Sequence, residues 1–575
     1  MFITISKNGI DIKPDKNTYF YNEGFVWFKG YFFMDDTYYS SKKAADYFNS
    51  FKSSEHLKTL IGKLNGVYTI IIANKTNKQL IIANDRFGFG HLFFAKQKHE
   101  LSLSDGFWEL ATETGNHNID EMAMYEMLRL RYVLRGHTIV QDIQEIEPSS
   151  IYTITFNQQI NIDREEYWNF QYQPKSIPLY EASKKIHSCL NSIIRRYTQN
   201  VFHGSKTGLN LTGGIDSRYL LSLLLKNNHS PKDLSAYTFG TSHCEDIKIS
   251  SQLTELCKLE HITHIFEEPF DDFFNKDTID EILHKIGHSC FYFQGYGFSK
   301  ILPFYKNIDY LLTGADGFYI GLCSNNKLFS INNSEELINY ILEINATILD
   351  TKSIKKISKF NVCELEELLY KKIQNKVLSS NYDLISTFFD WTLKNRVGKY
   401  IVSIYEILNK NTTVLYPYYD YEFIDLMSSL PYNVLINQNA YVDSMYKHSF
   451  VEEYKDLANT PVENRKVHHN GENFILKRKN KNFFQKSISK LFAKPEHNYT
   501  YPIYKTFKHS KNDFYKMIRL LTKDESQYFN SVDIIKLIKK NSRNEMFFRY
   551  GLLAILSVYR LESTLTINQQ FKTKS

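Results

Sequence analysis

Residues 211–218, LTGGIDSR, place two glycines, two hydroxyl side chains and a carboxylate between two apolar runs of the chain. These runs predict a buried strand followed by a buried helix. At such a junction, unpaired backbone N–H groups and the positive end of the helix dipole favour an anion. Gly213 and Gly214 let the backbone turn tightly and let the anion approach without meeting a Cβ atom. Thr212 and Ser217 add hydroxyl donors, so the segment predicts a phosphate-binding loop.

Asp216 follows the glycines at the start of the predicted helix, where a carboxylate does not favour a bare phosphate. The combination becomes favourable when the carboxylate holds Mg²⁺ that the phosphates share. No lysine follows the glycines, so this is not the GxxxxGK[ST] loop of enzymes that transfer a terminal phosphate. We expect a loop that binds pyrophosphate with a metal. The alternative is a glycine turn in which Asp216 and Ser217 cap the helix.

Strands and helices alternate around this loop, as is typical of βαβ units and a parallel sheet. The expected strands are 209–211, 234–240, 261–268 and 308–314, and the expected helices are 215–227, 245–259 and 277–290. Residues 1–165 instead contain mainly short strands bounded by Gly, Asn or Asp, with helices expected at 42–52 and 119–131. Beyond residue 330 the pattern is almost wholly helical, apart from a basic, loop-like stretch at 464–482.

The bulk composition excludes several classes of protein. The 575 residues include 43% hydrophobic and 23% charged side chains, which is typical of a globular chain of two to four domains. A net charge of +7, spread over 70 basic and 63 acidic residues, is too dilute to predict a nucleic-acid partner. The six cysteines form no CxxC pair, the first residues do not read as a signal peptide, and no apolar stretch approaches the roughly 18–20 residues of a membrane helix. We expect a cytoplasmic protein without a membrane span.

The motif S/T-G-G-x-D-S resembles the loop of the ATP-pyrophosphatase, or PP-loop, superfamily, whose members cut ATP between its α- and β-phosphates. Residues 64–94, 136–154 and 414–431 are similar to stretches of the asparagine synthetases, so the resemblance covers nearly the whole chain. It implies an α/β protein of two domains. Residues 1–165 would be a class II glutamine amidotransferase-like domain, an αββα sandwich of the N-terminal-nucleophile type. Residues 166–575 would be an ATP-dependent ligase domain built on a doubly wound parallel sheet with many helices.

The chain departs from this family at the amidotransferase nucleophile. In the family a cysteine follows the initiator methionine, and its thiol and free amine hydrolyse glutamine. Here Phe2 stands in that place, and the first cysteine is Cys189. An N-terminal nucleophile needs a thiol or hydroxyl beside a free amine, so we expect glutamine hydrolysis to be lost and the domain to serve structure or substrate docking. β-Lactam synthetases and lasso-peptide cyclases resemble the chain in this absence, and they close a ring with the substrate's own amine.

A second departure falls in the stretch LLTGADGFYIG, which resembles the family's LSGEGADELFG. Thr313 and Gly314 match the Ser-Gly pair that contacts the nucleotide, whereas Ala315 replaces a glutamate and Phe318 replaces an aspartate. Asp316 lies two residues before that aspartate. If the loop is two residues shorter, we expect Asp316 to be a catalytic residue and the second Mg²⁺ ligand. The alternative is a turn-forming aspartate in a strand–helix connection.

The resemblance also assigns neighbours of the loop to the ATP site. Leu211 joins the loop residues there, and the strand AYTFG would contact adenine through the backbone of Tyr237 and Phe239. A plain buried strand is the alternative. Glu245 and Asp246 open the next expected helix where the family has an acidic pair, although acids in a first turn also complement the helix dipole.

Two basic residues are candidates for the catalytic cation. Lys447 and Arg465 lie near basic segments of the family, and a cation beside the triphosphate would stabilise charge on the departing pyrophosphate. The alternative for both is a solvated surface charge.

The resemblance implies ATP-dependent, AMP-forming amide-bond synthesis through an acyl-adenylate, with ATP and Mg²⁺ as cofactors. The carboxylate would belong to a small molecule or peptide, and the amine to free ammonia or to the substrate itself, which includes ring closure. A partner protein or precursor peptide is expected in the peptide case. Two alternatives stay open: a glutamine-hydrolysing asparagine synthase, and a non-catalytic binding protein derived from such an enzyme. Transfer of sulfur or an amine to RNA by a PP-loop relative lacks support from any basic stripe.

Overall fold

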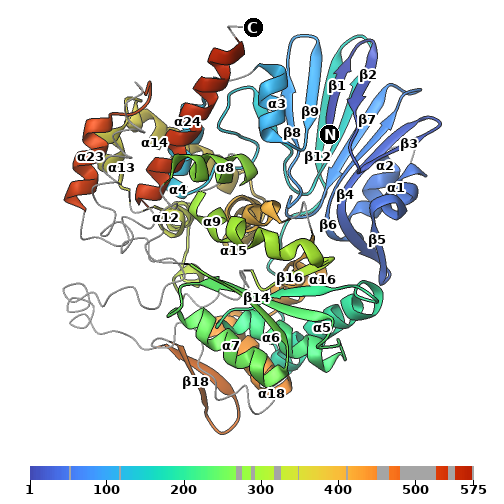
Figure 1. Cartoon of the computed structure of the whole chain (residues 1–575), viewed down its shortest axis with the longest axis vertical. Coiled ribbons are helices and arrows are strands. Elements are labelled where there is room, and N and C mark those ends of the chain that lie inside the picture. The colour runs from blue at the N-terminus through green and yellow to red at the C-terminus, as the bar shows by residue number, and fades with distance from the viewer. Residues whose placement is uncertain are drawn as a thin grey trace.

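The computed structural model describes residues 1–50, 54–115, 118–266, 275–286, 292–315, 326–347, 349–408, 412–449, 465–478, 526–541 and 551–572. Within these ranges the molecule has two parts. Residues 1–166 contain two antiparallel sheets and are called the N-terminal half, although they are less than a third of the chain. In the other half, which is the rest of the chain, a parallel sheet lies among helices (Figure 1). Every helix in the described ranges falls short of the length and apolarity that crossing a membrane requires.

The N-terminal half is built from a smaller and a larger antiparallel sheet. The smaller sheet has the order β10-β8-β9-β1-β2 and comprises β1 (Phe2–Ser6), β2 (Gly9–Lys13), β8 (Phe93–Lys96), β9 (Glu100–Ser104) and β10 (Ile143–Glu145). The larger has the order β12-β11-β7-β6-β4-β3, with β5 also pairing β4; it comprises β3 (Thr18–Tyr21), β4 (Gly24–Met34), β5 (Thr37–Ser40), β6 (Asn65–Asn74), β7 (Gln79–Asn84), β11 (Ser150–Phe156) and β12 (Ile160–Glu166).

The two sheets pack face to face and are covered by helices. Ile5 of β1 packs with Trp27 of β4 and Ile71 of β6 in the core between the sheets. The outer face of the larger sheet meets Phe48 of α1 (Ser41–Asn49) and Leu57 of α2 (Ser54–Ile61). On the other side, α3 (Phe107–Thr114) packs against β8 and β9. This order of layers agrees with the expected αββα sandwich, and it explains why β6 is apolar on both faces.

The parallel sheet has the order β15-β14-β13-β16-β17. Its strands are β13 (Thr207–Asn210), β14 (Leu234–Gly240), β15 (Glu260–Ile265), β16 (Tyr310–Thr313) and β17 (Thr413–Leu415), and every adjacent pair is parallel. The helices between β13 and β16 are α6 (Ile215–Lys226), α7 (Glu245–Cys257), α8 (Lys276–Ile286), α9 (Tyr292–Ile301) and the short η1 (Leu302–Asn307), and α5 (Leu179–Asn200) precedes β13. The predicted alternation is therefore confirmed, and β17 is an additional strand that the sequence pattern did not predict.

The remaining described elements are mostly helical; α4 agrees with the helix predicted at 119–131, and the helices beyond residue 330 agree with the predicted helical pattern. They are α4 (Glu121–Leu130), α11 (Asn326–Phe329), α12 (Ser334–Asn345), α13 (Thr351–Ile357), α14 (Val362–Leu378), α15 (Leu384–Thr392), η2 (Leu393–Val402), η3 (Ser403–Ile407), η4 (Pro417–Tyr419), α16 (Tyr421–Ser428), α17 (Tyr432–Leu435), η5 (Ile436–Gln438), α18 (Asn439–His448), α23 (Ser531–Lys540) and α24 (Leu553–Lys572). The loop predicted at 464–482 is wrong in its described part, where β18 (Arg465–His469) and β19 (Phe474–Arg478) form an antiparallel hairpin. Alternating side chains and the turn at Gly471 support this hairpin despite its basic composition.

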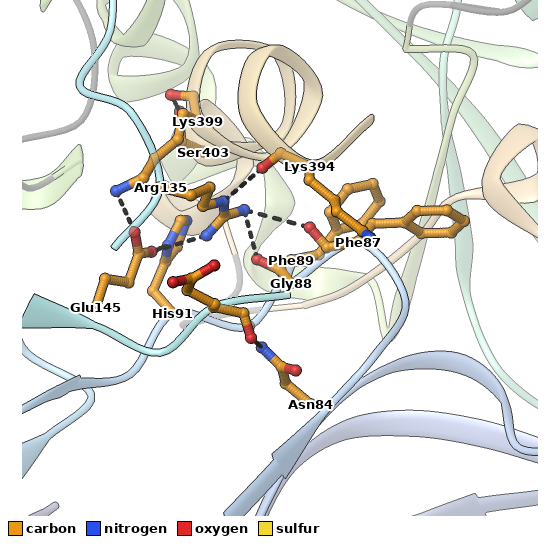
Figure 2. Close-up of polar contacts among 12 residues, drawn as sticks. Asn84, Phe87, Gly88, Phe89, His91, Arg135, Glu145, Lys394, Lys399 and Ser403 are labelled. Carbon is orange, nitrogen blue, oxygen red and sulfur yellow. Dashed lines mark hydrogen bonds and ion pairs between the residues drawn. The ribbon is translucent and has the colours of Figure 1, made fainter. Parts of the chain in front are cut away.

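A buried carboxylate joins the two halves of the chain. Glu145 ends β10, and its fully buried side chain forms ion pairs with Arg135, His91 and Lys399, the last from η2 (Figure 2). Arg135 Nε also donates to the carbonyl oxygen of Lys394 at 2.7 Å. Burial alone would raise the pKa of Glu145, but Lys399, Arg135 and His91 hold that pKa well below its usual value. The carboxylate is therefore ionised and bridges both halves.

A second buried contact fixes the same interface. Arg196 of α5 lies 2.6 Å from the carboxylate of Asp420 (Nη2 to Oδ2), which is almost fully buried. Asn65 of β6 donates to the other oxygen of Asp420 at 2.8 Å. A strand of the N-terminal half and a helix of the parallel-sheet half are thus held by one carboxylate.

We expect Glu145→Gln to lower the free energy of unfolding at pH 7 by about 3–5 kcal/mol, because it leaves Arg135 and Lys399 buried without their counter-charge. The matched control is Glu147→Gln, which removes a half-exposed partner of Arg164 and should cost less than about 1 kcal/mol. Urea unfolding measures both values, and equal losses in the two variants would contradict the assignment.

The pH dependence of the free energy of unfolding gives a second test of Glu145→Gln. The folded-state pKa of Glu145 lies below its unfolded value, so its stabilisation is fully present above the unfolded pKa. It is lost as the pH falls through the folded-state pKa. The stability gap between wild type and Glu145→Gln should therefore close in acid.

Candidate functional site

The predicted phosphate-binding loop lies at the carboxyl end of the parallel sheet. β13 ends at Asn210 and α6 begins at Ile215, so the turn between them is at the carboxyl end of a strand with parallel neighbours on both sides. Ligands of open parallel sheets bind in the crevice at this end of the strands. α6 is buried along most of its length, which fixes its N-terminus at the turn.

Two hydroxyl groups hold the loop in shape. The Thr212 amide donates to Ser217 Oγ at 3.1 Å, and the Gly214 amide donates to Thr212 Oγ1 at 3.1 Å. The N-cap residue of α6 is Gly214, and no side-chain cap is found there within the described chain. Thr212 and Ser217 therefore serve the turn itself, and the structure does not show the alternative in which Asp216 and Ser217 cap the helix.

The amide of Gly213 already points at an anion. It donates to Asp246 Oδ1 at 2.9 Å, a carboxylate in the first turn of α7. The Gly213 amide is thus oriented toward a negative group of the chain itself, and the predicted binding of a phosphate at this loop stays a prediction.

Asp216 is held by two buried tyrosines. Tyr441 of α18 donates its hydroxyl to Asp216 Oδ1 at 2.8 Å, and the Tyr418 hydroxyl donates to the Asp216 carbonyl oxygen at 2.9 Å. The two hydroxyl groups are 2.7 Å apart. Burial, followed by the charge of Asp216, raises the pKa of both phenols well above the usual value, so both stay protonated donors. Sequence reasoning missed this pair; Tyr418 lies in a stretch that it had singled out, and Tyr441 carried no signal.

The end of β16 packs directly against the loop. A Cβ atom on Gly314 would lie 2.9 Å from the Ser217 amide nitrogen, so only glycine allows this approach. Thr313 Oγ1 accepts from the Ala315 amide at 3.0 Å and is 2.7 Å from the Tyr405 hydroxyl. The structure therefore brings the predicted pair Thr313 and Gly314 to the loop.

The described contacts of β14, the strand predicted to contact adenine, are with other residues of the chain. The Leu211 amide donates to the Tyr237 carbonyl oxygen at 3.0 Å, and Thr238 Oγ1 donates to the Leu211 carbonyl oxygen at 2.7 Å. The ring of Tyr237 stacks on Tyr305 with centroids 4.5 Å apart, and Phe239 packs against aromatic neighbours. Leu211 and Tyr237 are thus hydrogen-bonded next to the loop and Phe239 lies among aromatic rings, and no described contact distinguishes an ATP role from that of a buried strand.

The two candidate cations, Lys447 and Arg465, lie on α18 and at the start of β18. Lys447 Nζ is 3.2 Å from Asp443 Oδ1 and donates to Asn473 Oδ1 at 2.8 Å, which ties it to α18 and the β18–β19 hairpin. Arg465 begins β18 opposite Arg478 in the register. The Lys447 side chain is 21% exposed and pairs a fully buried carboxylate, so it is not a fully solvated surface charge, and its role as a catalytic cation stays a prediction.

Asp316, the predicted second metal ligand, lies outside the described residues, and so does Phe318. Among the residues that are described, no group of three or more His, Cys, Asp or Glu side chains is placed to hold a metal. Mg²⁺ usually takes only one or two protein carboxylates and completes its shell with phosphate oxygens and water. The oriented carboxylate of Asp216 fits that kind of site.

One span of the N-terminal half is similar to a known domain family. Residues 53–168 match the family model of the glutamine amidotransferase domain, a span that includes β6 to β12. This part of the chain is therefore related to glutamine amidotransferase domains.

The particular relatives agree with this class. Over 203 residues the chain is 21% identical to asparagine synthetase [glutamine-hydrolyzing] 1 of Bacillus subtilis (strain 168), a match that covers 35% of this chain and 31% of that protein. The chain thus matches less than a third of the length of this curated relative.

Solved structures add no independent support for the fold. The glutamine phosphoribosylpyrophosphate amidotransferase from B. subtilis, complexed with ADP and GMP, is 10% identical and has a TM-score of 0.19, covering 43% of this chain and 48% of its own. A structure described as the allosteric regulatory enzyme of purine biosynthesis is 9% identical and has the same TM-score, covering 44% and 62%. Scores at this level establish no common fold.

We expect Tyr441→Phe to lower the free energy of unfolding by about 1–2 kcal/mol, because Asp216 loses a buried hydrogen-bond donor. Tyr180→Phe is the matched control, since the Tyr180 side chain is 57% exposed and its hydroxyl remains hydrated. Urea unfolding of both variants gives the comparison. A loss in Tyr441→Phe no larger than in Tyr180→Phe would show that the phenol does not hold Asp216.

Proposed function

We propose that the chain is an ATP-dependent ligase that forms an amide bond and releases AMP and pyrophosphate. The observation that carries this proposal is the turn between β13 and α6, where the Gly213 amide points at a carboxylate and Gly314 packs against the loop. The match of residues 53–168 to a glutamine amidotransferase domain and the similarity to an asparagine synthetase support the same class of chemistry.

In the proposed reaction, a carboxylate oxygen of the substrate attacks the α-phosphorus of ATP. The bond from that phosphorus to the bridging oxygen breaks, pyrophosphate leaves, and the carboxylate becomes an acyl-adenylate. The nitrogen of an amine then attacks the acyl carbon, AMP leaves, and the nitrogen loses a proton. The amides of Gly213 and Gly214, the hydroxyls of Thr212 and Ser217, and the positive end of α6 would favour the charge on the departing pyrophosphate.

Mg²⁺, when bound, would neutralise part of the phosphate charge. Asp216 would hold it, because Tyr441 fixes its carboxylate beside the loop. Asp316 is proposed as the second ligand on the sequence pattern alone. Leu211, Tyr237, Phe239, Thr313 and Gly314 are proposed to line the ATP site, and Lys447 and Arg465 stay the candidate cations.

The proposed amine is free ammonia or an amine of the substrate, rather than glutamine. Two facts support this choice: residues 1–188 contain no cysteine, and Phe2 fills the start of β1 with a buried ring. With an amine on the substrate itself, the same chemistry closes a ring, in a small molecule or in a peptide delivered by a partner protein. A glutamine-hydrolysing asparagine synthase is the alternative within this class.

A non-catalytic binding protein is the second candidate function. The observation that favours it is the Gly213 amide, which is already taken by Asp246. An enzyme must exchange this carboxylate for a phosphate oxygen in every cycle, whereas a binding protein can keep it.

Pyrophosphate release distinguishes the two candidates. We expect the full chain, given ATP and Mg²⁺, to release pyrophosphate only when a suitable carboxylate from a substrate panel is present. No release with any member of the panel, including aspartate with ammonia, would favour the binding protein.

Asp216→Asn should reduce this release at least about 100-fold, a loss of some 2.7 kcal/mol in the barrier. The amide oxygen of asparagine can still accept from Tyr441, so the variant should remain folded with little change in stability. Asp163→Asn, on the exposed side of β12, is the matched control and should keep full activity. An active Asp216→Asn would overturn the role of the loop.

A further inference from the structure

Arg218, the last residue of the segment LTGGIDSR, is a fully buried arginine. It is the fourth residue of α6, and its side chain is 0% exposed. The residues that follow it on this helix include the buried Leu220, Leu221 and Leu223. A guanidinium group therefore lies in a part of the core that the same helix otherwise fills largely with apolar side chains.

This position is unfavourable for a cation on two counts. The N-terminus of a helix is the positive end of its dipole, so a cation at the end of the first turn is disfavoured there. Taking a guanidinium group out of water also costs free energy, even when it is well paired. An apolar side chain would meet neither penalty. Residues that break local rules in this way are expected at functional sites, so the contacts of Arg218 indicate what it does.

The side chain of Arg218 reaches the backbone of the phosphate-binding loop. Side chains on a helix lean toward its N-terminus, and from the fourth position of α6 this direction leads to the turn after β13. Nη2 of Arg218 donates to the carbonyl oxygen of Gly213 at 3.4 Å, in a buried contact. The guanidinium group thus holds the loop from the side of the core.

The carbonyl group of Gly213 shares a peptide unit with the amide of Gly214. A peptide unit is planar and trans, so its carbonyl and its N–H point in opposite directions. With the carbonyl oxygen turned to Arg218, the Gly214 N–H points away from the core, and it donates to Oγ1 of the exposed Thr212 at 3.1 Å. Arg218 and Thr212 therefore hold the two ends of one peptide unit.

The orientation of this peptide unit decides which charge the loop presents. Glycine has no Cβ atom and adopts both signs of φ, so a peptide between Gly213 and Gly214 can rotate at little steric cost. After such a rotation a carbonyl oxygen would replace the N–H on the exposed side of the loop. A carbonyl oxygen repels a phosphate, whereas an N–H attracts it, so the loop needs a group that holds the carbonyl on the buried side.

We propose that Arg218 is a positioning residue of the pyrophosphate site: by holding the Gly213 carbonyl oxygen on the buried side, it keeps the Gly214 amide on the side where a phosphate enters. The inference rests on the proposed function, because it concerns the same loop. Arg218 acts through the peptide unit and does not touch the ligand, so it differs in role from the candidate cations Lys447 and Arg465.

The experiment is isothermal titration of the full chain with two probes, pyrophosphate in the presence of Mg²⁺ and AMP. Arg218→Met removes the donor and keeps a long, unbranched side chain. We expect this variant to bind pyrophosphate at least about tenfold more weakly than wild type, a difference of some 1.4 kcal/mol. Its affinity for AMP should stay within about threefold, because AMP lacks the two phosphates that the loop is proposed to hold. A general loss of structure would instead weaken both probes alike.

Arg164→Met is the matched control, since Arg164 lies on β12 in the N-terminal half and its side chain is 33% exposed. It should leave both affinities unchanged. If Arg218→Met does not fold, as judged by circular dichroism, Arg218→Gln repeats the test with a neutral side chain too short to reach the Gly213 carbonyl.

The possible outcomes separate this inference from the proposed function. Wild-type affinity for pyrophosphate in the Arg218 variant, or equal losses for the two probes, would overturn the role of Arg218 and leave the loop as the proposed site. Failure of both Arg218 variants to fold would assign the residue to the fold and overturn its positioning role as well. A wild-type chain that does not bind pyrophosphate would contradict the proposed function and this inference together.

Discussion

The ionised carboxylate of Glu145 is the interaction on which the arrangement of the two halves depends. It is fully buried, so it must be compensated, and its partners come from both sides of the interface. Arg135 extends the contact to the backbone of η2, which anchors the helical segment that follows α15. The same carboxylate also contacts Nδ1 of the buried His91 ring, so it joins three side chains at one point of the interface.

The polar groups of the loop at the end of β13 are also held by contacts within the chain. Its hydroxyls hold the turn, its Gly213 amide is oriented by Asp246, and its Asp216 carboxylate is oriented by Tyr441. Each of these polar groups is therefore held by a partner within the described chain. Gly314, which follows the neighbouring strand β16, packs directly against the Ser217 backbone of the loop.

The parallel sheet brings the polar groups of the loop together. The loop at the carboxyl end of β13 presents amides and hydroxyls next to the N-terminus of α6. Helix N-termini point toward the carboxyl ends of parallel strands, so this arrangement follows from the fold.

The sequence by itself determined the local features of this protein. Apolar periodicity and turn residues predicted the alternation of strands and helices, down to the bounds of β14, and the glycines of LTGGIDSR predicted the turn at α6. These features depend on neighbouring residues, so a single sequence contains them. β17 and the β18–β19 hairpin were missed because one is three residues long and the other has the composition of a loop.

Only the tertiary structure decided which side chains meet. Asp216 and Tyr441 are 225 positions apart, Gly213 and Asp246 are 33 apart, and His91 and Glu145 are 54 apart. No spacing rule links such pairs, and their protonation depends on burial and on charges that the folded chain brings near. The sequence therefore supplied the loop and its residue types, while packing assigned Asp216, Asp246 and Glu145 their partners.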